Sequence, residues 1–255
     1  MPSITRSLSL IALPGIPEIA PGDDLCRIII DAMTAADILP AEGDIFVVAQ
    51  KIVSKAEGRC IELSTVTASA EASSLASETG KDERIVELIL RESVEIVRHR
   101  PGLIIARHRN GYVVANAAVD LSNAGRTGLA VLLPEDADRS AAVLRAGLQQ
   151  SAGVSIGVVI NDSMGRAWRN GTTGTAIGAS GLAALQDRRG AVDRHGMQLQ
   201  SSEIALADEI ASAASLLMGQ ADEGLPVVLL RGALWAVGDG RAADLVRPVA
   251  LDLFR

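Results

Sequence analysis

The sequence contains few aromatic residues and carries a negative net charge. Only five of its 255 residues are Phe, Trp or Tyr, which is too few to form a base-stacking platform for single-stranded nucleic acid. The formal net charge of −7 also argues against general binding to phosphate backbones. No apolar run reaches the roughly 18 residues of a membrane span. We therefore expect neither nucleic acid nor a membrane as a partner.

Cysteine is also scarce. Cys26 and Cys60 lie in apolar segments without metal-ligand spacing, and the three histidines show no such spacing either. The N-terminal segment 1–11 lacks a small-residue cleavage site, so it predicts a first strand rather than a signal peptide. A reduced, cytoplasmic protein is the simplest interpretation.

The remaining pattern mixes helices and strands without strict alternation, which favours an α+β fold with mixed sheets and flanking helices. We expect one unit over residues 1–255, with a soft internal boundary near 134–138, where proline and acidic residues interrupt the pattern. Strands are predicted over 7–12, 44–49, 95–98, 102–107, 112–115, 129–133, 154–160 and 227–231, and helices over 25–38, 68–77, 82–92, 138–150 and 202–218. Asn110-Gly111 predicts a hairpin with a type I′ turn.

Two carboxylates follow predicted strands. Asp162 ends the apolar run V-S-I-G-V-V-I, at a place where a sheet would open to solvent, and Asp120 follows the strand Y-V-V-A together with Asn116 and Asn123. Mg²⁺ and Mn²⁺ prefer such hard oxygen ligands, and two carboxylates could hold metals that neutralise phosphate charge. The alternative is that each carboxylate caps a turn.

Two of the only three lysines, Lys51 and Lys55, lie four residues apart after a buried strand. Because the other 21 basic residues are arginine, this placement favours a phosphate contact by a compact point charge. The alternative is that Lys55 and Glu57 are solvated surface groups.

Segment 165–181 contains five glycines and predicts a glycine-rich loop. Its spacing matches neither a Walker A loop nor a dinucleotide-binding fingerprint, so a flexible loop is the alternative to an anion site. Arg166 and Arg169 could clamp a substrate carboxylate there.

Taken together and in order, seven short motifs resemble the coenzyme F(420)-0:L-glutamate ligase family. They are L-P-G-I-P-E-I from Leu13, S-K-A-E-G-R from Ser54, N-A-A-V-D-L-S-N from Asn116, I-N-D-S-M-G-R from Ile160, A-I-G-A-S-G from Ala176, A-D-E-I-A from Ala207 and L-L-M-G-Q from Leu216. The resemblance covers about residues 10–238. Some members carry a further C-terminal flavin-binding domain, and because this chain ends at Arg255 the resemblance implies the stand-alone form.

The resemblance implies a γ-glutamyl-ligase-type fold that forms an intertwined homodimer. It implies GTP-dependent ligation of L-glutamate to coenzyme F(420)-0, and of further γ-linked glutamates, through an acyl phosphate with release of GDP and phosphate. It also implies manganese or magnesium, with two ions expected, and a monovalent cation as a further candidate.

The resemblance further implies roles for individual residues. Lys55, Asp120 and Asp162 are the expected catalytic residues, and Asp120, Asp162, Ser163 and Gln220 the expected metal ligands. The expected nucleotide contacts are Pro17, Glu18, Ile19, Ala20, Gln50, Lys51, Lys55, Asn123, Met218, Gly219, Gln220, Ala221, Asp222, Glu223, Gly224 and Leu225. Gln220 stands where some relatives have a glutamate, so Asp222 or Glu223 could compensate for the weaker amide ligand.

Given a deazaflavin acceptor, Trp168 is expected near the bound substrate, because it lies between Arg166 and Arg169, our own candidates for substrate carboxylates. Two other functions use the same residues. A metal-dependent phosphohydrolase could employ the same pair of aspartates, and a non-catalytic protein could bind the nucleotide or the deazaflavin without turnover.

Overall fold

The computed structural model describes residues 6–122, 124–125, 127–233 and 238–253. Its central sheet has the strand order β1 (Ser9–Ala12), β12 (Val227–Arg231), β2 (Ile45–Ala49), β8 (Gly157–Arg166) and β9 (Arg169–Ser180). Strands β2 and β8 are parallel, and the other neighbours are antiparallel. The apolar runs of β2 and β8 are buried because helices cover both faces of the sheet.

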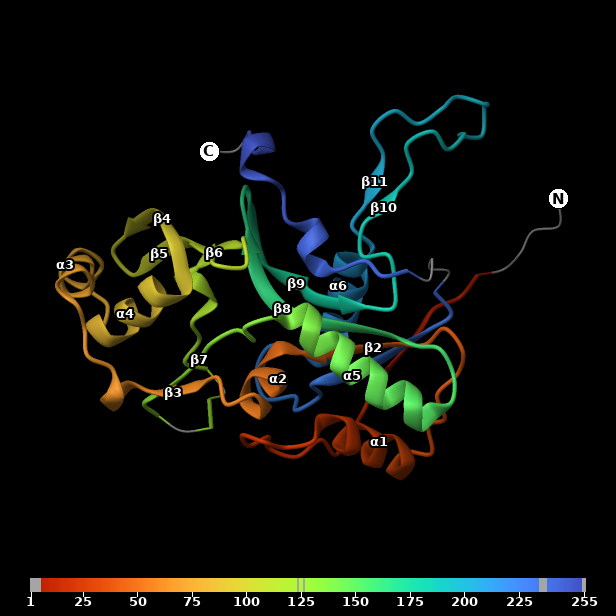
Figure 1. The fold of residues 1–255 in the computed structure, drawn as a ribbon, viewed down its shortest axis with the longest axis horizontal. Helices are drawn as coiled ribbons and strands as arrows, with labels where there is room; N and C mark the ends of the chain where they lie inside the picture. The colour runs from red at the N-terminus through yellow and green to blue at the C-terminus, as the bar shows by residue number, and fades with distance from the viewer. Residues whose placement is uncertain (1–5, 123, 126, 234–237, 254–255) are drawn as a thin grey trace.

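Three helices cover this sheet (Figure 1). On one face, α1 (Leu25–Ala35) and α5 (Ala137–Ala152) pack on a core that includes Phe46, Val158 and Ile160. On the other face, α6 (Leu206–Met218) packs on a core that includes Val47, Val159 and Val228. Alternate residues of β2 and β8 thus enter different cores, as the two-residue period of a strand requires. A short helix, α2 (Gln50–Ala56), follows β2 directly.

A second body of structure, which we call the lobe, lies to the left of the sheet in Figure 1. The lobe comprises β3 (Cys60–Glu62), α3 (Ala70–Thr79), α4 (Glu83–Glu92), β4 (Ser93–Arg100), β5 (Leu103–His108), β6 (Val113–Ala115) and β7 (Leu129–Val131). Strands β4, β5 and β6 form one sheet, and β3 pairs with β7. The lobe has its own apolar core, which includes Val86, Ile89 and Ile104. The α+β class with mixed sheets is therefore confirmed.

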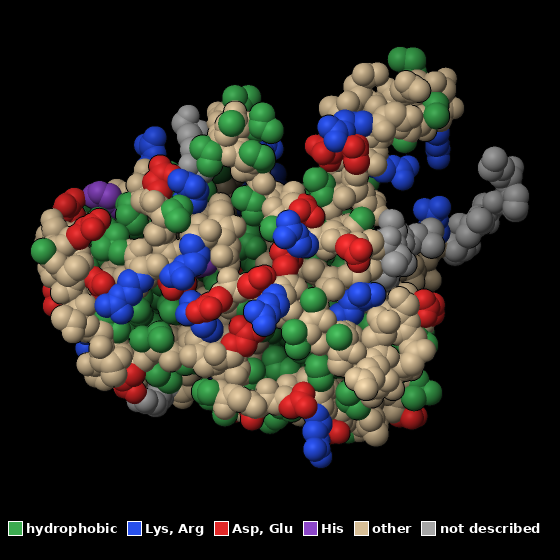
Figure 2. Space-filling view, viewed as in Figure 1, with side chains coloured by type: hydrophobic (Ala, Val, Ile, Leu, Met, Phe, Trp, Pro, Cys, Tyr) green, Lys and Arg blue, Asp and Glu red, His purple; other side chains and the backbone are tan. Residues whose placement is uncertain are grey.

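A long excursion, which we call the arm, leaves the body at β10 (Gln186–Asp187) and returns at β11 (Glu203–Ile204). It stands clear of the remaining surface (Figure 2). Val192 and Met197 are mostly exposed along it. No helix in the described part of the chain is long and apolar enough to cross a membrane.

The predicted glycine-rich loop at 165–181 is wrong, because these residues form the β8–β9 hairpin. Its glycines allow helices to pack tightly on the sheet. A Cβ on Gly174 would lie 2.3 Å from the Ala211 carbonyl oxygen of α6, and one on Gly178 would lie 2.2 Å from the Ala137 carbonyl oxygen of α5. Packing against helices, rather than loop flexibility, therefore accounts for these two glycines.

Two other predictions need correction. The hairpin at Asn110-Gly111 exists, but only Gly111 has a positive φ, so the turn is not type I′. The last helix begins at Leu206 rather than 202, because β11 occupies the preceding residues.

Candidate active site

A cavity of about 980 Å³ is lined both by the end of the central sheet and by the lobe. Its size lies within the range of small-molecule sites. The lining residues fall within segments 16–19, 49–55, 82–85, 121–129, 161–163 and 215–226, together with Leu63. Segments that are far apart in the sequence therefore meet around one space.

Most of the residues predicted for the nucleotide and metal site line this cavity. They are Pro17, Glu18, Ile19, Gln50, Lys51, Lys55, Asp162, Ser163 and all eight residues from Met218 to Leu225. Ala20 is not among the lining residues, and its N–H donates to Asp23 instead. Asn123 lies outside the described residues.

Helix α2 places its lysines toward the cavity. It starts directly after β2, and Lys51 and Lys55, one turn apart, lie on the same side of the helix. Lys55 is only 7% exposed, which for a lysine requires a partner, and its Nζ is paired with the carboxylate of Glu18. Gln50 is buried as well and accepts a hydrogen bond from Ser54.

Of the two predicted aspartates, Asp162 lines the cavity, whereas Asp120 is not among the lining residues and is joined to the site through Lys51. Asp120 lies 2.8 Å from the Lys51 Nζ and also accepts a bond from the Ser122 N–H. Asp162 lies on β8, half-buried, one residue beyond the last pair that β8 forms with β2. The N–H of Ser163 donates to its carboxylate.

The two carboxylates differ in how their charge is balanced. Burial, followed by the nearby charge of Asp120, raises the pKa of Asp162 to about 6, although Ser163, Lys51 and Gln50 oppose the rise. Burial also raises the pKa of Asp120, but the bonds from Lys51 and Ser122 outweigh it, so that pKa is lowered overall. A carboxylate with uncompensated charge in a cavity marks a candidate functional group.

The donor set fits a divalent metal. Asp120 and Asp162 supply carboxylate oxygens, Ser163 a hydroxyl and Gln220 an amide oxygen, all hard donors suited to Mg²⁺ or Mn²⁺. The negative charge that raises the pKa of Asp162 is what such an ion would neutralise. Across the described residues no cluster of three His, Cys, Asp or Glu side chains could hold an ion. Substrate oxygens or water would therefore complete the coordination, as is usual for Mg²⁺.

The loop after α6 forms another wall of the cavity. Glu223 folds back on this loop, and N–H groups of the loop, that of Ala221 first, lower its pKa. Its carboxylate occupies the place where a Cβ on Gly219 would lie, so a side chain at 219 would disrupt the turn. Gln220 and Asp222 are exposed to the cavity side of the loop.

Several lining residues were not predicted as site residues. Asp82 and Arg84 reach the cavity from the start of α4, where Arg84 pairs with Asp82, and the sequence indicates only a helix cap there. Asn161 is buried and donates to Ser215 of α6 at 3.0 Å. The position of Asn161 at the end of a predicted buried strand is the feature of the sequence that indicates a site residue.

Arg166, Trp168 and Arg169 lie at the tip of the β8–β9 hairpin and are not among the residues that line this cavity. Trp168 is 83% exposed and has a positive φ of 65°. Within this chain the structure does not bring these side chains to Asp162, and their substrate role stays a prediction.

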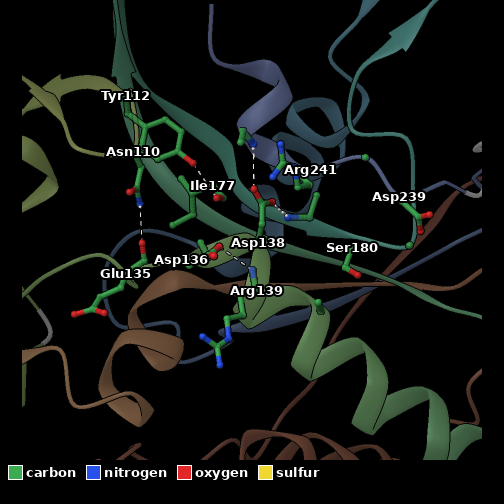
Figure 3. Close-up of a pocket in the computed structure, with 16 residues that line it drawn as sticks. Asn110, Tyr112, Glu135, Asp136, Asp138, Arg139, Ile177, Ser180, Asp239 and Arg241 are labelled. Carbon is green, nitrogen blue, oxygen red and sulfur yellow. Dashed lines mark hydrogen bonds between the residues drawn. The ribbon is translucent and has the colours of Figure 1, made fainter.

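A second cavity, of about 580 Å³, lies beside the start of α5 (Figure 3). Its central carboxylate, Asp138, accepts bonds from the N–H groups of Ala179 and Ala242, and Tyr112 donates to the Ile177 carbonyl oxygen. Asp138 and Tyr112 form these hydrogen bonds with backbone groups, so both side chains hold β9 in place, and Asp138 also holds the C-terminal segment.

Comparison with known proteins identifies the family of this chain. The chain is 45% identical over 250 residues to the coenzyme F420:L-glutamate ligase of Methanothermobacter thermautotrophicus, covering 97% of this chain and 99% of that protein. It is 45% identical over 242 residues to the protein of the same name from Methanopyrus kandleri, covering 93% and 94%. The family model described as F420-0:Gamma-glutamyl ligase matches residues 15–232. The chain therefore belongs to the F420-0:Gamma-glutamyl ligase family.

Proposed function

We propose that this protein joins L-glutamate to coenzyme F(420)-0, and adds further γ-linked glutamates, with GTP as the phosphoryl donor. The observation that carries the proposal is a cavity large enough for a nucleotide that is lined by Lys51 and Asp162, with Asp120 paired to Lys51. Membership of the family and the names of the relatives support the choice of substrates.

The proposed reaction has two steps. An oxygen of the acceptor carboxylate attacks the γ-phosphorus of GTP, the bond to the bridging oxygen breaks, and GDP leaves. The glutamate amine then attacks the acyl carbon of the acyl phosphate, loses a proton, and expels phosphate. Both steps require an environment that stabilises phosphoryl negative charge.

Residues of the cavity supply that environment. Lys51 and Lys55 bring two positive charges to its wall, where they can stabilise the transferring phosphoryl group. Asp120, Asp162, Ser163 and Gln220 would hold manganese or magnesium, which supplies further charge neutralisation when bound. Pro17–Ile19 and the loop 218–225 would enclose the nucleotide. A monovalent cation belongs to the proposal only as a further candidate.

We also propose that the protein acts as a homodimer. The arm between β10 and β11 exposes Val192 and Met197, and an extended two-stranded excursion gains stability by packing on a second molecule. Light scattering coupled to size-exclusion chromatography should give twice the 26.5 kDa chain mass. A monomer mass at micromolar concentration would contradict this part.

The test of the activity combines mass spectrometry with a GDP assay. With coenzyme F(420)-0, L-glutamate, GTP and Mn²⁺ together, we expect a product heavier by one glutamyl residue and one GDP released per bond formed. Each mixture lacking one component should give neither. GDP release without an acceptor would favour a phosphohydrolase, and GTP binding without turnover on any acceptor would favour a binding protein.

A further inference from the structure

Asn116, Ala117 and Ala118 form a left-handed turn directly before the catalytic region. Their φ values are +53°, +50° and +57°. Residues with a Cβ avoid this conformation because the Cβ approaches the carbonyl oxygen, and only asparagine among these three tolerates it readily. Left-handed residues normally occur singly, so three in succession, two of them alanine, are exceptional.

The turn carries a second cost. The side-chain oxygen of Asn116 is buried, and no hydrogen-bond partner for it exists in the described part of the chain. A buried acceptor without a partner destabilises the folded state. A strained backbone and an unpaired polar atom thus coincide within one turn, where neither improves stability.

Packing on both sides holds the turn in this conformation. Ala117 is 1% exposed and belongs to the core of the lobe, whereas Ala118 packs against the core of the central sheet. The turn therefore crosses the boundary between two cores. Strained conformations persist only where the surroundings determine them, and they concentrate at functional sites.

The turn fixes the position of Asp120. After the turn, Val119 enters the lobe core, and Asp120 exchanges two backbone hydrogen bonds with Val131, of 3.1 and 2.8 Å. Its carboxylate thereby lies 2.8 Å from Lys51, on an element of the other core. A right-handed or extended conformation at Ala117 and Ala118 would redirect the chain just before this residue.

We propose that Asn116–Ala118 is a positioning element whose left-handed geometry holds the Asp120 carboxylate in place for the metal–nucleotide site. The inference rests on the proposed function for what Asp120 binds, but not for how Asp120 is held. Alanine serves here better than glycine, because glycine would accept the same turn while also permitting others.

The test is Ala118→Gly, with Asp37→Gly as the matched control. Asp37 also has a left-handed φ, of +55°, but lies exposed after α1, away from the cavity. Glycine fits both positions, so the melting temperature of each variant should stay within about 2 °C of wild type or rise. In Ala118→Gly alone, the amides of Asp120 and Val131 should exchange with deuterium at least about tenfold faster.

A second readout uses Mn²⁺ alone, titrated by electron paramagnetic resonance without nucleotide or acceptor. The Mn²⁺ dissociation constant should rise about tenfold in Ala118→Gly and stay unchanged in Asp37→Gly. Wild-type exchange rates at Asp120 and Val131, or a wild-type Mn²⁺ dissociation constant, in Ala118→Gly would overturn the proposal. Absence of ligation by the wild-type protein would reject the proposed function while leaving both readouts interpretable.

Discussion

Glu92 in the lobe is buried and Asp162 in the cavity is half-buried, and the charges around the two carboxylates differ. Glu92 is 4% exposed and lies 2.9 Å from Arg59 and 2.7 Å from Arg109, with His108 at 3.4 Å. Burial raises the pKa of Glu92, but these three neighbours together lower it below its usual value. Among the residues that the structure describes, no arginine offsets the charge of Asp162, and its pKa rises to about 6.

The difference separates a carboxylate used for stability from one available for binding. The cluster around Glu92 joins α4 to Arg59 at β3 and to the carbonyl oxygen of Leu133 before α5, so it links the lobe to the sheet. Among the described residues, Ser163, Lys51 and Gln50 offset the charge of Asp162 only in part, which leaves room for an ion or ligand to balance it. Functional sites commonly retain such unfavourable groups at the expense of stability.

The largest effect on stability is expected for Glu92, the carboxylate that is paired with arginines. Glu92→Ala removes the carboxylate shared by Arg59 and Arg109 from a buried ionic cluster, and leaves Arg59 only the more distant carboxylate of Glu135, at 3.5 Å. The free energy of unfolding should fall by about 3–5 kcal/mol, measured by urea denaturation at pH 7.5. A loss below about 1 kcal/mol would show that the cluster does not hold the lobe.

Asp162, the carboxylate without an arginine partner in the described chain, should matter for activity. Asp162→Asn should reduce the ligation rate by about 10²–10³-fold, because the site loses a carboxylate that would position the charge needed for phosphoryl transfer. The circular dichroism spectrum should stay unchanged. Asp31→Asn is the control, since Asp31 is exposed on α1, where it pairs with Arg27. Wild-type ligation by Asp162→Asn would remove this residue from the mechanism.

Lys51→Met removes the ammonium group that pairs with Asp120, so that the carboxylate of Asp120 loses its cationic partner. The bond from Lys51 lowers the pKa of Asp120, so its loss should raise that pKa. Because ligand binding needs the ionised carboxylate, the acidic limb of the kcat/KM profile should move to higher pH. The rate at pH 7 should fall about tenfold, as expected for one charged hydrogen bond. An unshifted acidic limb would contradict this.

The smallest effect is expected at the hairpin tip. Trp168→Ala should raise the KM for the acceptor about two- to tenfold, the range for loss of one aromatic contact, and leave that for GTP unchanged. Trp168 is mostly exposed, so stability should change little. Unchanged acceptor affinity would refute the predicted contact.

Much of the cavity could be predicted from the sequence because its residues mark the ends of elements. Asp162 follows the apolar run of β8, and Lys51 and Lys55 follow that of β2, so the parallel pairing of these strands brings all three to one edge. The motifs then connected this edge with residues 17–19 and 218–225.

The rest depends on contacts that a local pattern does not contain. The glycines of β9 indicated a loop, because nothing near them in the sequence shows that α5 and α6 pack there. Arg84 reaches the cavity only because the lobe folds toward the sheet. The left-handed turn at Asn116–Ala118 is equally hidden, since alanine predicts the opposite conformation.

The most direct test of this comparison is the pH dependence of stability, measured without metal in the presence of a chelator. The unfolded Asp162 has a pKa near 3.8 and the folded one about 6, so its ionisation destabilises the folded state above pH 6, and this penalty disappears as the pH falls toward 4. Glu92 has the opposite sign, because its lowered pKa stabilises the folded state above the unfolded value and this contribution is lost on acidification.

The measurement is the difference in free energy of unfolding between Asp162→Asn and wild type at pH 8 and pH 4. We predict that the variant is more stable at pH 8 by about 1–3 kcal/mol, the upper figure corresponding to the full rise in pKa, and that the difference vanishes at pH 4. Glu92→Gln should instead be less stable than wild type at pH 8. An Asp162→Asn variant that is less stable than wild type at pH 8 would contradict the account, because the charge of Asp162 would then be balanced within the protein itself.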